Sequence, residues 1–411
     1  MNWEMMNSTQ KYFLEALSDF ISGRATAVPP DADPAELLRL ADIHSVGGII
    51  WAQCRELFSD PGRCDAETAG RMHSYFLGDV YVSLCRREAT GEITDAFEAA
   101  GIGYMPFKGE IIKDLYPAPE LREMGDIDIL VSPSDMDAAC EIMKGLGYTD
   151  HTETPDVTEF HRGLLVYEIH RRAIYEDIGN GTDAAGFFDA FPEHAVRHGL
   201  AAEPEAGFHY AFITAHTAKH IVNRGSGFRP FLDMILLARK VKSIPEEAEK
   251  TREMLNELKL SDFESICSAL CLRWFGGSLV CEPAVLTEEF FEETTEKVFR
   301  DGVFGKSNGD TINEHGNVAK TMKRRGIYYV IDAVKFFFGR IFPPYGEMRY
   351  VESYSFIDGR PWLIPAAWVK RWVVSLFRHP GRSARLALHP MIRKNEIDKR
   401  NRFLRDWGIG K

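Results

Sequence analysis

Two aspartates separated by one residue, Asp126 and Asp128, are the clearest candidates for chemistry in this chain. They belong to a mostly apolar segment that predicts a β-strand. Successive side chains of a strand point to opposite faces, so the two carboxylates share one face while Ile127, Ile129 and Val131 share the other. Close carboxylates repel each other unless a cation neutralises them, and oxygen ligands favour Mg²⁺ or Mn²⁺. The pair therefore indicates a metal site suited to phosphoryl chemistry.

A third carboxylate, Glu168, lies in a second apolar segment, residues 163–170, which also predicts a strand. Alternation places Glu168 and His170 on one face of that strand, and Leu165 and Tyr167 on the other. If the two strands are neighbours in one sheet, Glu168 comes close to the aspartate pair. We therefore expect Glu168 to complete the metal site.

Lys108 and Gly109 follow a predicted strand over residues 101–107 and precede a predicted helix over residues 110–116. A strand, a glycine turn and a helix allow backbone N–H groups to approach a phosphate, and a lysine adds a positive charge. The sequence therefore predicts that Lys108 and Gly109 bind phosphate.

The order of these motifs resembles that of the polymerase-beta-like nucleotidyltransferases, and within them a large group of uncharacterised nucleotidyltransferases. The shared pattern consists of Lys108-Gly109, Tyr116-Pro117, Arg122, Asp126-x-Asp128 and Glu168-x-His170. The resemblance is clearest over residues 95–240. It implies an α/β (α+β) fold in which a small mixed-sheet nucleotidyltransferase core is flanked by helical lobes.

The resemblance also implies an enzyme and its site. The metal ligands and catalytic residues would be Asp126, Asp128 and Glu168, with Mg²⁺ or Mn²⁺ bound, and the nucleotide would contact Lys108, Gly109 and Arg122. The reaction would move a nucleoside monophosphate from a nucleoside triphosphate, expected to be ATP, to a hydroxyl of a small molecule or protein. Pyrophosphate would be released. The sequence leaves the base preference and the acceptor open.

One departure from the superfamily keeps two alternatives open. Better-known members carry Gly-Ser or Gly-Gly and a shorter interval to the first aspartate, whereas Gly109 is followed here by Glu110. A catalytically weak, nucleotide-binding regulatory module is one alternative. The other is a metal-dependent phosphohydrolase that uses the same carboxylates with His216 and His220.

Residues 208–222 predict a helix with a polar stripe. Helical spacing places His209, His216 and His220 on one face, with Lys219 beside them. The stripe is a candidate for the acceptor side of the site, although a hydrogen-bonded core histidine is the commoner role for each imidazole. A zinc protease is disfavoured because Thr217 stands where its motif needs glutamate.

His170 and Arg229 are further candidates for the acceptor side. Arg229 follows a glycine-rich turn at the start of a predicted helix. Asp233 lies four residues later, a spacing at which opposite charges pair along a helix. We favour this ion pair over a direct contact between Arg229 and a ligand.

The pattern of apolar residues predicts four regions in this chain of 411 residues. They are an N-terminal helical lobe (1–94), an α/β core (95–183), a second helical lobe (184–304) and a C-terminal helical region with a basic tail (305–411). Glycine-rich and polar residues suggest linkers at 27–34, 179–186 and 305–316. An aromatic-rich stretch, residues 327–342, is expected to form a buried helix.

The charge of the chain is polarised. Residues 370–411 contain 12 lysines or arginines against three acidic residues, although the whole chain has a net charge of −12. Trp368, Trp372, Phe377 and Trp407 are interleaved with these basic residues. We favour an electrostatic contact within the chain, in which this basic tail covers the acidic lobes. A contact with an anionic membrane surface or with RNA stays open.

The N-terminal residues lack the layout of a secretory signal, and no apolar segment reaches membrane-spanning length. The seven cysteines are scattered, and an odd number cannot all pair within one chain. We therefore expect reduced thiols and a cytoplasmic protein.

Overall fold

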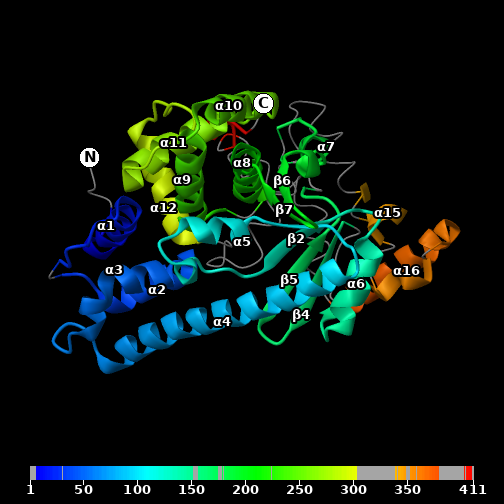
Figure 1. Cartoon of the computed structure of the whole chain (residues 1–411), viewed down its shortest axis with the longest axis horizontal. Helices are drawn as coiled ribbons and strands as arrows, with labels where there is room; N and C mark the ends of the chain where they lie inside the picture. The colour runs from blue at the N-terminus through cyan, green and yellow to red at the C-terminus, as the bar shows by residue number, and fades with distance from the viewer. Residues whose placement is uncertain are drawn as a thin grey trace.

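The fold was analysed in a computed structural model of the chain. The structure describes residues 6–302 except 30, 151–155, 175–177, 179 and 224. Of the C-terminal part it describes residues 338–339, 341–348, 352–357, 359–378, 402 and 404–409. Within these ranges a mixed sheet lies among helices, as Figure 1 shows. The predicted α/β class with a mixed-sheet core is confirmed.

The sheet has seven strands in the described residues, in the order β3-β4-β5-β2-β1-β7-β6. Their bounds are β1 (Tyr104–Phe107), β2 (Ile127–Val131), β3 (Thr149–Asp150), β4 (Val157–Arg162), β5 (Leu165–His170), β6 (Ala195–His198) and β7 (Ala201–Pro204). The central strand β2 runs parallel to β5 and antiparallel to β1. The strands that carry the predicted carboxylates are therefore neighbours.

The longer helices before the sheet are α1 (Ser8–Ser22), α2 (Pro34–His44), α3 (Gly47–Ser59) and α4 (Ala66–Ala99). Between and after the strands follow α5 (Gly109–Ile112), α6 (Met136–Gly145), α7 (Ala184–Phe188), α8 (Ala206–Asn223), α9 (Arg229–Lys242), α10 (Pro245–Glu257), α11 (Ser261–Phe275) and α12 (Glu288–Asp301). Near the C-terminus lie α15 (Tyr345–Met348) and α16 (Ile364–Arg378). Side-chain caps fix several starts, such as Asn7 before α1 and Asp65 before α4.

The two faces of the sheet differ as the alternation predicts. Ile127, Ile129 and Val131 of β2 lie with Tyr167 and Ile169 of β5 in a buried apolar cluster. The helices α4 and α6 contribute further residues of that cluster, and Figure 1 shows α4 running along this side of the sheet. The polar side chains of the same strands consequently point to the opposite face.

A second, larger apolar core joins the helices before and after the sheet. The ring of Phe13 on α1 lies 5.9 Å from that of Phe228 and 6.0 Å from that of Phe299 on α12, measured between centroids. His44 is buried among these rings, and burial lowers its pKa to about 3. Helices α1–α3 and α8–α12 therefore pack as parts of one continuous core.

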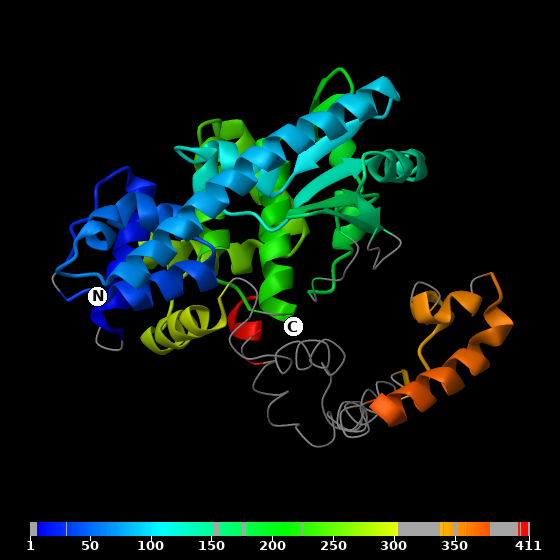
Figure 2. The ribbon, with the colours of Figure 1, turned by 90° about the horizontal axis from the view of Figure 1, so that it is seen from below.

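The end of the chain packs on the same core. Trp407 is 2% exposed, and its ring centroid lies 5.8 Å from that of Phe263 on α11 and 5.9 Å from that of Phe290 on α12. Figure 2 shows this last segment beside α12. The predicted linker 305–316, most of the helix expected at 327–342, and residues 379–400 of the basic tail lie outside the described residues. The partner of that tail stays a prediction.

Two further observations concern the cysteines and the helices. All seven cysteines are free thiols, which confirms the expectation that they do not pair. Among the described residues, every helix is too short or too polar to cross a bilayer.

Candidate active site

Strand pairing brings two of the predicted carboxylates together. β2 and β5 are aligned so that Asp128 lies directly opposite Glu168, and Leu130 opposite His170. The side chain of Asp128 is only 4% exposed, whereas that of Glu168 is 23% exposed. Asp126 comes just before β2 begins and is exposed. The site is therefore an edge at which one carboxylate is buried and two are open to solvent.

Lys108 supplies the positive charge at this edge. It follows β1, and its ammonium lies 2.5 Å from one carboxylate oxygen of Asp128 and 3.9 Å from one of Glu168. Burial disfavours the charged amine, but the three neighbouring carboxylates outweigh it, so the pKa of Lys108 is raised. Burial likewise works to raise the pKa of Asp128, but Lys108 and His170 hold it well below its usual range. Both groups are therefore charged at neutral pH.

The backbone of Lys108 is in an unusual conformation. Its φ of 53° and ψ of −126° lie in a region that favours glycine and costs about 1–3 kcal/mol for other residues. The backbone N–H of Lys108 donates to Nε2 of His209 on α8, at 3.0 Å. Because burial lowers the pKa of His209 to about 3, this ring is neutral and Nε2 is free to accept. His209 thus helps to hold the turn that aims the ammonium at the carboxylates.

His170 belongs to the carboxylate cluster, although the sequence placed it among candidates for the acceptor side. Its Nε2 lies 2.8 Å from Asp128 and 3.0 Å from Glu168. Burial and the charge of Lys108 lower its pKa, but the hydrogen bonds to the two carboxylates outweigh them and raise it. The ring also packs edge-on against Phe107, with 5.0 Å between centroids. His170 therefore fixes the separation of the two carboxylates.

The donor set fits a divalent metal. In the described residues, one group could meet on a single ion, formed by Asp128, Glu168 and His170, whose ligand atoms all lie within 4.8 Å of one another. Asp126 is outside that group but close to it. Desolvation by the surrounding protein is the largest effect on Asp126, and the negative charges of Asp128 and Glu168 add to it. Together they raise the pKa of Asp126 to about 6. The two carboxylates suit Mg²⁺ or Mn²⁺, whereas an imidazole ligand is more typical of transition metals. An ion at this position would share Asp128 with Lys108.

Arg122, predicted to bind nucleotide, is engaged in a buried ion pair. Its guanidinium donates two hydrogen bonds, of 2.9 and 2.8 Å, to the carboxylate of Asp233 on α9. Tyr116 donates a third, of 2.8 Å, to the same carboxylate. A Cβ built on Gly109 would overlap the guanidinium, so the glycine provides the space in which Arg122 lies. These contacts join the segment between β1 and β2 to α9.

The favoured pairing of Arg229 with Asp233 is wrong. Asp233 binds Arg122, while Nη1 of Arg229 donates to the backbone carbonyl of Glu123 at 2.8 Å. The Nε of Arg229 is buried without a hydrogen-bond partner in the described structure. Burial first, and then the charge of Arg122, lower the pKa of Arg229. The bidentate geometry available across the two segments explains why Asp233 pairs with the distant arginine and not along its own helix.

The predicted histidine stripe lies on α8. Nε2 of His216 and Nε2 of His220 are 2.8 Å apart. Burial first, and then the charges of His220, Lys108 and Lys219, hold the pKa of His216 well below its ordinary value. His216 is therefore a neutral imidazole within electrostatic reach of Lys108. The structure places this part of the stripe near the carboxylates but outside the group that could meet on one ion.

A family model described as an uncharacterised nucleotidyltransferase matches residues 30–276. The chain belongs to this family. The match covers α2 to α11 as well as the sheet, so helices before and after the strands belong to the part of the chain that the family model matches. No curated protein and no solved structure shows a significant match to the chain.

The sequence pattern did not point to one residue that lies near the carboxylates. Arg86 of α4 donates to the backbone carbonyl of Gly125 at 3.0 Å, and its charge acts on Asp126. It is buried, with only 8% of its surface exposed. An arginine on the apolar face of a long helix was the available signal, but its partner lies about 40 positions later in the chain.

Replacement of His209 tests its role in positioning Lys108. We expect His209→Phe to cost about 1–3 kcal/mol in the free energy of unfolding, because the N–H of Lys108 loses its buried acceptor. Activity should fall by about tenfold or more as the ammonium loses its aim. Denaturant unfolding and initial rates measure the two effects. His209→Gln, whose amide oxygen can accept, should restore much of the rate; equal rates for both variants would contradict the role.

Proposed function

We propose that this protein transfers a nucleoside monophosphate from a nucleoside triphosphate to a hydroxyl of a small molecule or protein, with Mg²⁺ or Mn²⁺ as cofactor. The observation that carries this proposal is the opposition of Asp128 and Glu168 on neighbouring strands, with the ammonium of Lys108 against them. Membership in a nucleotidyltransferase family supports the same reaction type.

The residues have distinct roles in this reaction. Asp128 and Glu168, together with Asp126, would hold the metal, which would polarise the phosphate oxygens and lower the pKa of the acceptor hydroxyl. Lys108 would bind phosphate oxygens and neutralise the negative charge that grows on them. Arg122 is bound to Asp233, so we assign it to the support of the site and not to the nucleotide.

The proton balance assigns a second role to Glu168. The acceptor oxygen forms a bond to the α-phosphorus. The bond from the α-phosphorus to the oxygen that it shares with the β-phosphorus breaks, and pyrophosphate leaves. The hydroxyl proton needs a base at the open edge of the site. Glu168 is more exposed than Asp128 and is not in hydrogen-bond contact with Lys108, so it is the carboxylate that we assign as base.

The phosphohydrolase alternative is less well supported. It would draw His216 and His220 into the metal group with the carboxylates. In the part of the chain that the structure describes, the imidazole that accompanies Asp128 and Glu168 is His170 instead. The regulatory-module alternative differs in the fate of bound nucleotide, and a labelling experiment separates it from transfer.

Glu168→Gln tests the proposed reaction. The protein is incubated with Mg²⁺ and each nucleoside triphosphate, labelled either at the α- or at the γ-phosphate, in the presence of pooled cell metabolites and proteins. We expect α-label to enter an acceptor and γ-label to appear in pyrophosphate. The variant should lose about 10²–10⁴-fold in rate, since the base is gone while a neutral ligand remains.

The matched control is Glu141→Gln, which removes the same charge from an exposed position on α6. It should keep the full rate. Appearance of the γ-label in inorganic phosphate would indicate that the protein hydrolyses the nucleotide and does not transfer it. Saturable nucleotide binding without either product would favour the regulatory module.

A further inference from the structure

A cavity of about 620 Å³ lies on the same face of the sheet as the carboxylates, but at the other end of the strands. It is lined by the start of β1, the end of β2 and the residues that follow β5 and β2. Ser132, which lines it, comes four residues after Asp128, or about 13 Å along an extended chain. Phe107, which pairs with Asp128, and His170, whose Nε2 contacts Asp128, are buried and do not line the cavity. The cavity is thus distinct from the candidate active site.

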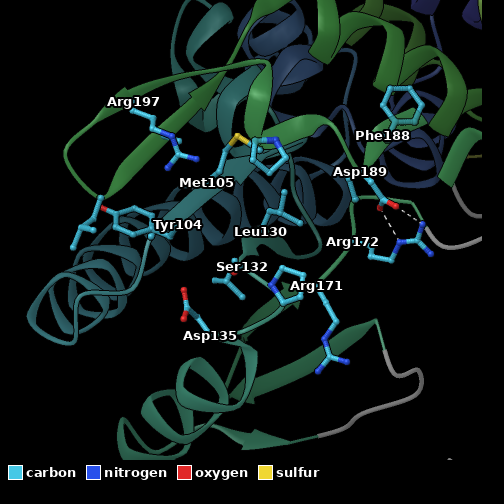
Figure 3. Close-up of a pocket in the computed structure, with 17 residues that line it drawn as sticks. Tyr104, Met105, Leu130, Ser132, Asp135, Arg171, Arg172, Phe188, Asp189 and Arg197 are labelled. Atoms are coloured by element: carbon cyan, nitrogen blue, oxygen red, sulfur yellow. Dashed lines mark hydrogen bonds and ion pairs between the residues drawn. The ribbon is translucent and has the colours of Figure 1, made fainter. Parts of the chain in front are cut away.

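The floor of the cavity is apolar. Met105 of β1 and Leu130 of β2 face each other across the strand pair, and Ala202 of β7 and Phe188 of α7 extend the same surface. Figure 3 shows Met105 and Leu130 at the centre of the cavity, with Phe188 at one side. Its volume lies in the range of sites that take small organic molecules, about 300–1,000 Å³. An apolar or aromatic body therefore fits this floor.

The rim of the cavity carries an excess of positive charge. Arg172 is neutralised by Asp189, to which it donates two hydrogen bonds of 2.8 and 2.6 Å. Arg171 and Arg197 also line the cavity, and no ion pair with a described residue holds either one. The Nε of Arg171 is buried without a hydrogen-bond partner among the described atoms. In Figure 3 the guanidinium of Arg197 reaches from β6 toward Met105.

We propose that this cavity is a second ligand site, which binds a small organic anion with an apolar or aromatic body. The body lies on Met105 and Leu130, and the anionic group, a carboxylate or a phosphate monoester, pairs with Arg197. The acid on the rim outside the Arg172 pair is Asp135, near Ser132 and opposite Arg197 in Figure 3, so an anion bound at Arg197 is kept away from it. The proposal concerns binding and stands whether or not the protein transfers nucleotides.

The cavity is also joined to the active site. Nδ1 of His170 lies 3.4 Å from the backbone carbonyl of Arg172, while Nε2 of the same ring contacts Asp128 and Glu168. The segment around Arg172 is therefore in contact with the histidine that spaces the carboxylates.

Fluorescence titration of the full chain with 8-anilinonaphthalene-1-sulfonate, an aromatic anion, tests the binding. We expect saturable binding at one site, weakened about tenfold in Arg197→Glu, because a charge-assisted contact becomes a repulsion. Arg239→Glu, the same change at an exposed position of α9, should leave binding unchanged. Ala202→Trp, which fills the cavity, should abolish binding; if it fails to fold, the Arg197 comparison decides alone.

Displacement of the dye then identifies the anionic group. 2-Naphthoate and 2-naphthyl phosphate distinguish a carboxylate from a phosphate monoester, and neutral 2-naphthol should displace at least tenfold less well than the better of the two. Equal dye binding by wild type and Arg197→Glu, absence of saturable binding, or displacement by 2-naphthol as effective as by the anions would each overturn the proposal. None of these readouts depends on nucleotide transfer.

Discussion

Asp128→Asn is expected to lower the rate of nucleotidyl transfer by at least about 10³-fold while the protein stays folded. Asp128 is the buried member of the carboxylate group and the residue that Lys108 and His170 both contact. Asparagine keeps the shape but removes the charge that would hold a metal and orient the ammonium. The release of pyrophosphate from each nucleoside triphosphate, in the presence of Mg²⁺ and pooled acceptors, measures this effect.

The control for this experiment is Asp137→Asn, at an exposed position in the first turn of α6. It should retain the wild-type rate. Circular dichroism and thermal unfolding must show that both variants are folded before their rates are compared. A folded Asp128→Asn variant with more than a tenth of the wild-type rate would remove Asp128 from the catalytic machinery.

Arg122→Met is expected to destabilise the protein by about 3–5 kcal/mol, because it leaves the carboxylate of Asp233 buried without its charge partner. The side chains of both residues are 7% exposed, and the pair joins the segment between β1 and β2 to α9. Denaturant unfolding, followed by circular dichroism, measures the change in the free energy of unfolding. If Arg122 were instead a surface residue that binds nucleotide, the substitution would leave stability nearly unchanged and would weaken nucleotide binding.

A second substitution separates a lost contact from an unpaired charge. In Arg122→Met/Asp233→Asn the uncompensated charge is gone, and the amide oxygen can still accept the hydrogen bond from Tyr116. This double variant should be more stable than Arg122→Met by about 1 kcal/mol or more. If the double variant is the less stable one, the buried charge is not what destabilises Arg122→Met.

Local pattern was sufficient for the strands that carry the chemistry. The alternation in residues 127–131 and 165–170 predicted which side chains enter the apolar cluster and which reach the polar face, and both strands follow it. This works because side-chain direction in a strand depends on position alone. Alternation does not define where a strand begins. Asp126 precedes β2 and is exposed, whereas Asp128 within the strand is buried.

The sequence by itself determined the fold class, the carboxylate and lysine motifs and the faces on which the residues of β2 and β5 lie. Tertiary structure alone decided the partners: that Asp233 binds Arg122 and not Arg229, that His209 holds the backbone of Lys108, and that His170 spans Asp128 and Glu168. His170 and Glu168 are two positions apart on one strand, whereas the other pairs are separated by 42 to 111 positions. Spacing along a helix or strand specifies the direction in which a side chain points. A hydrogen bond between segments also needs the two segments to pack at the right distance, and that packing depends on the whole core.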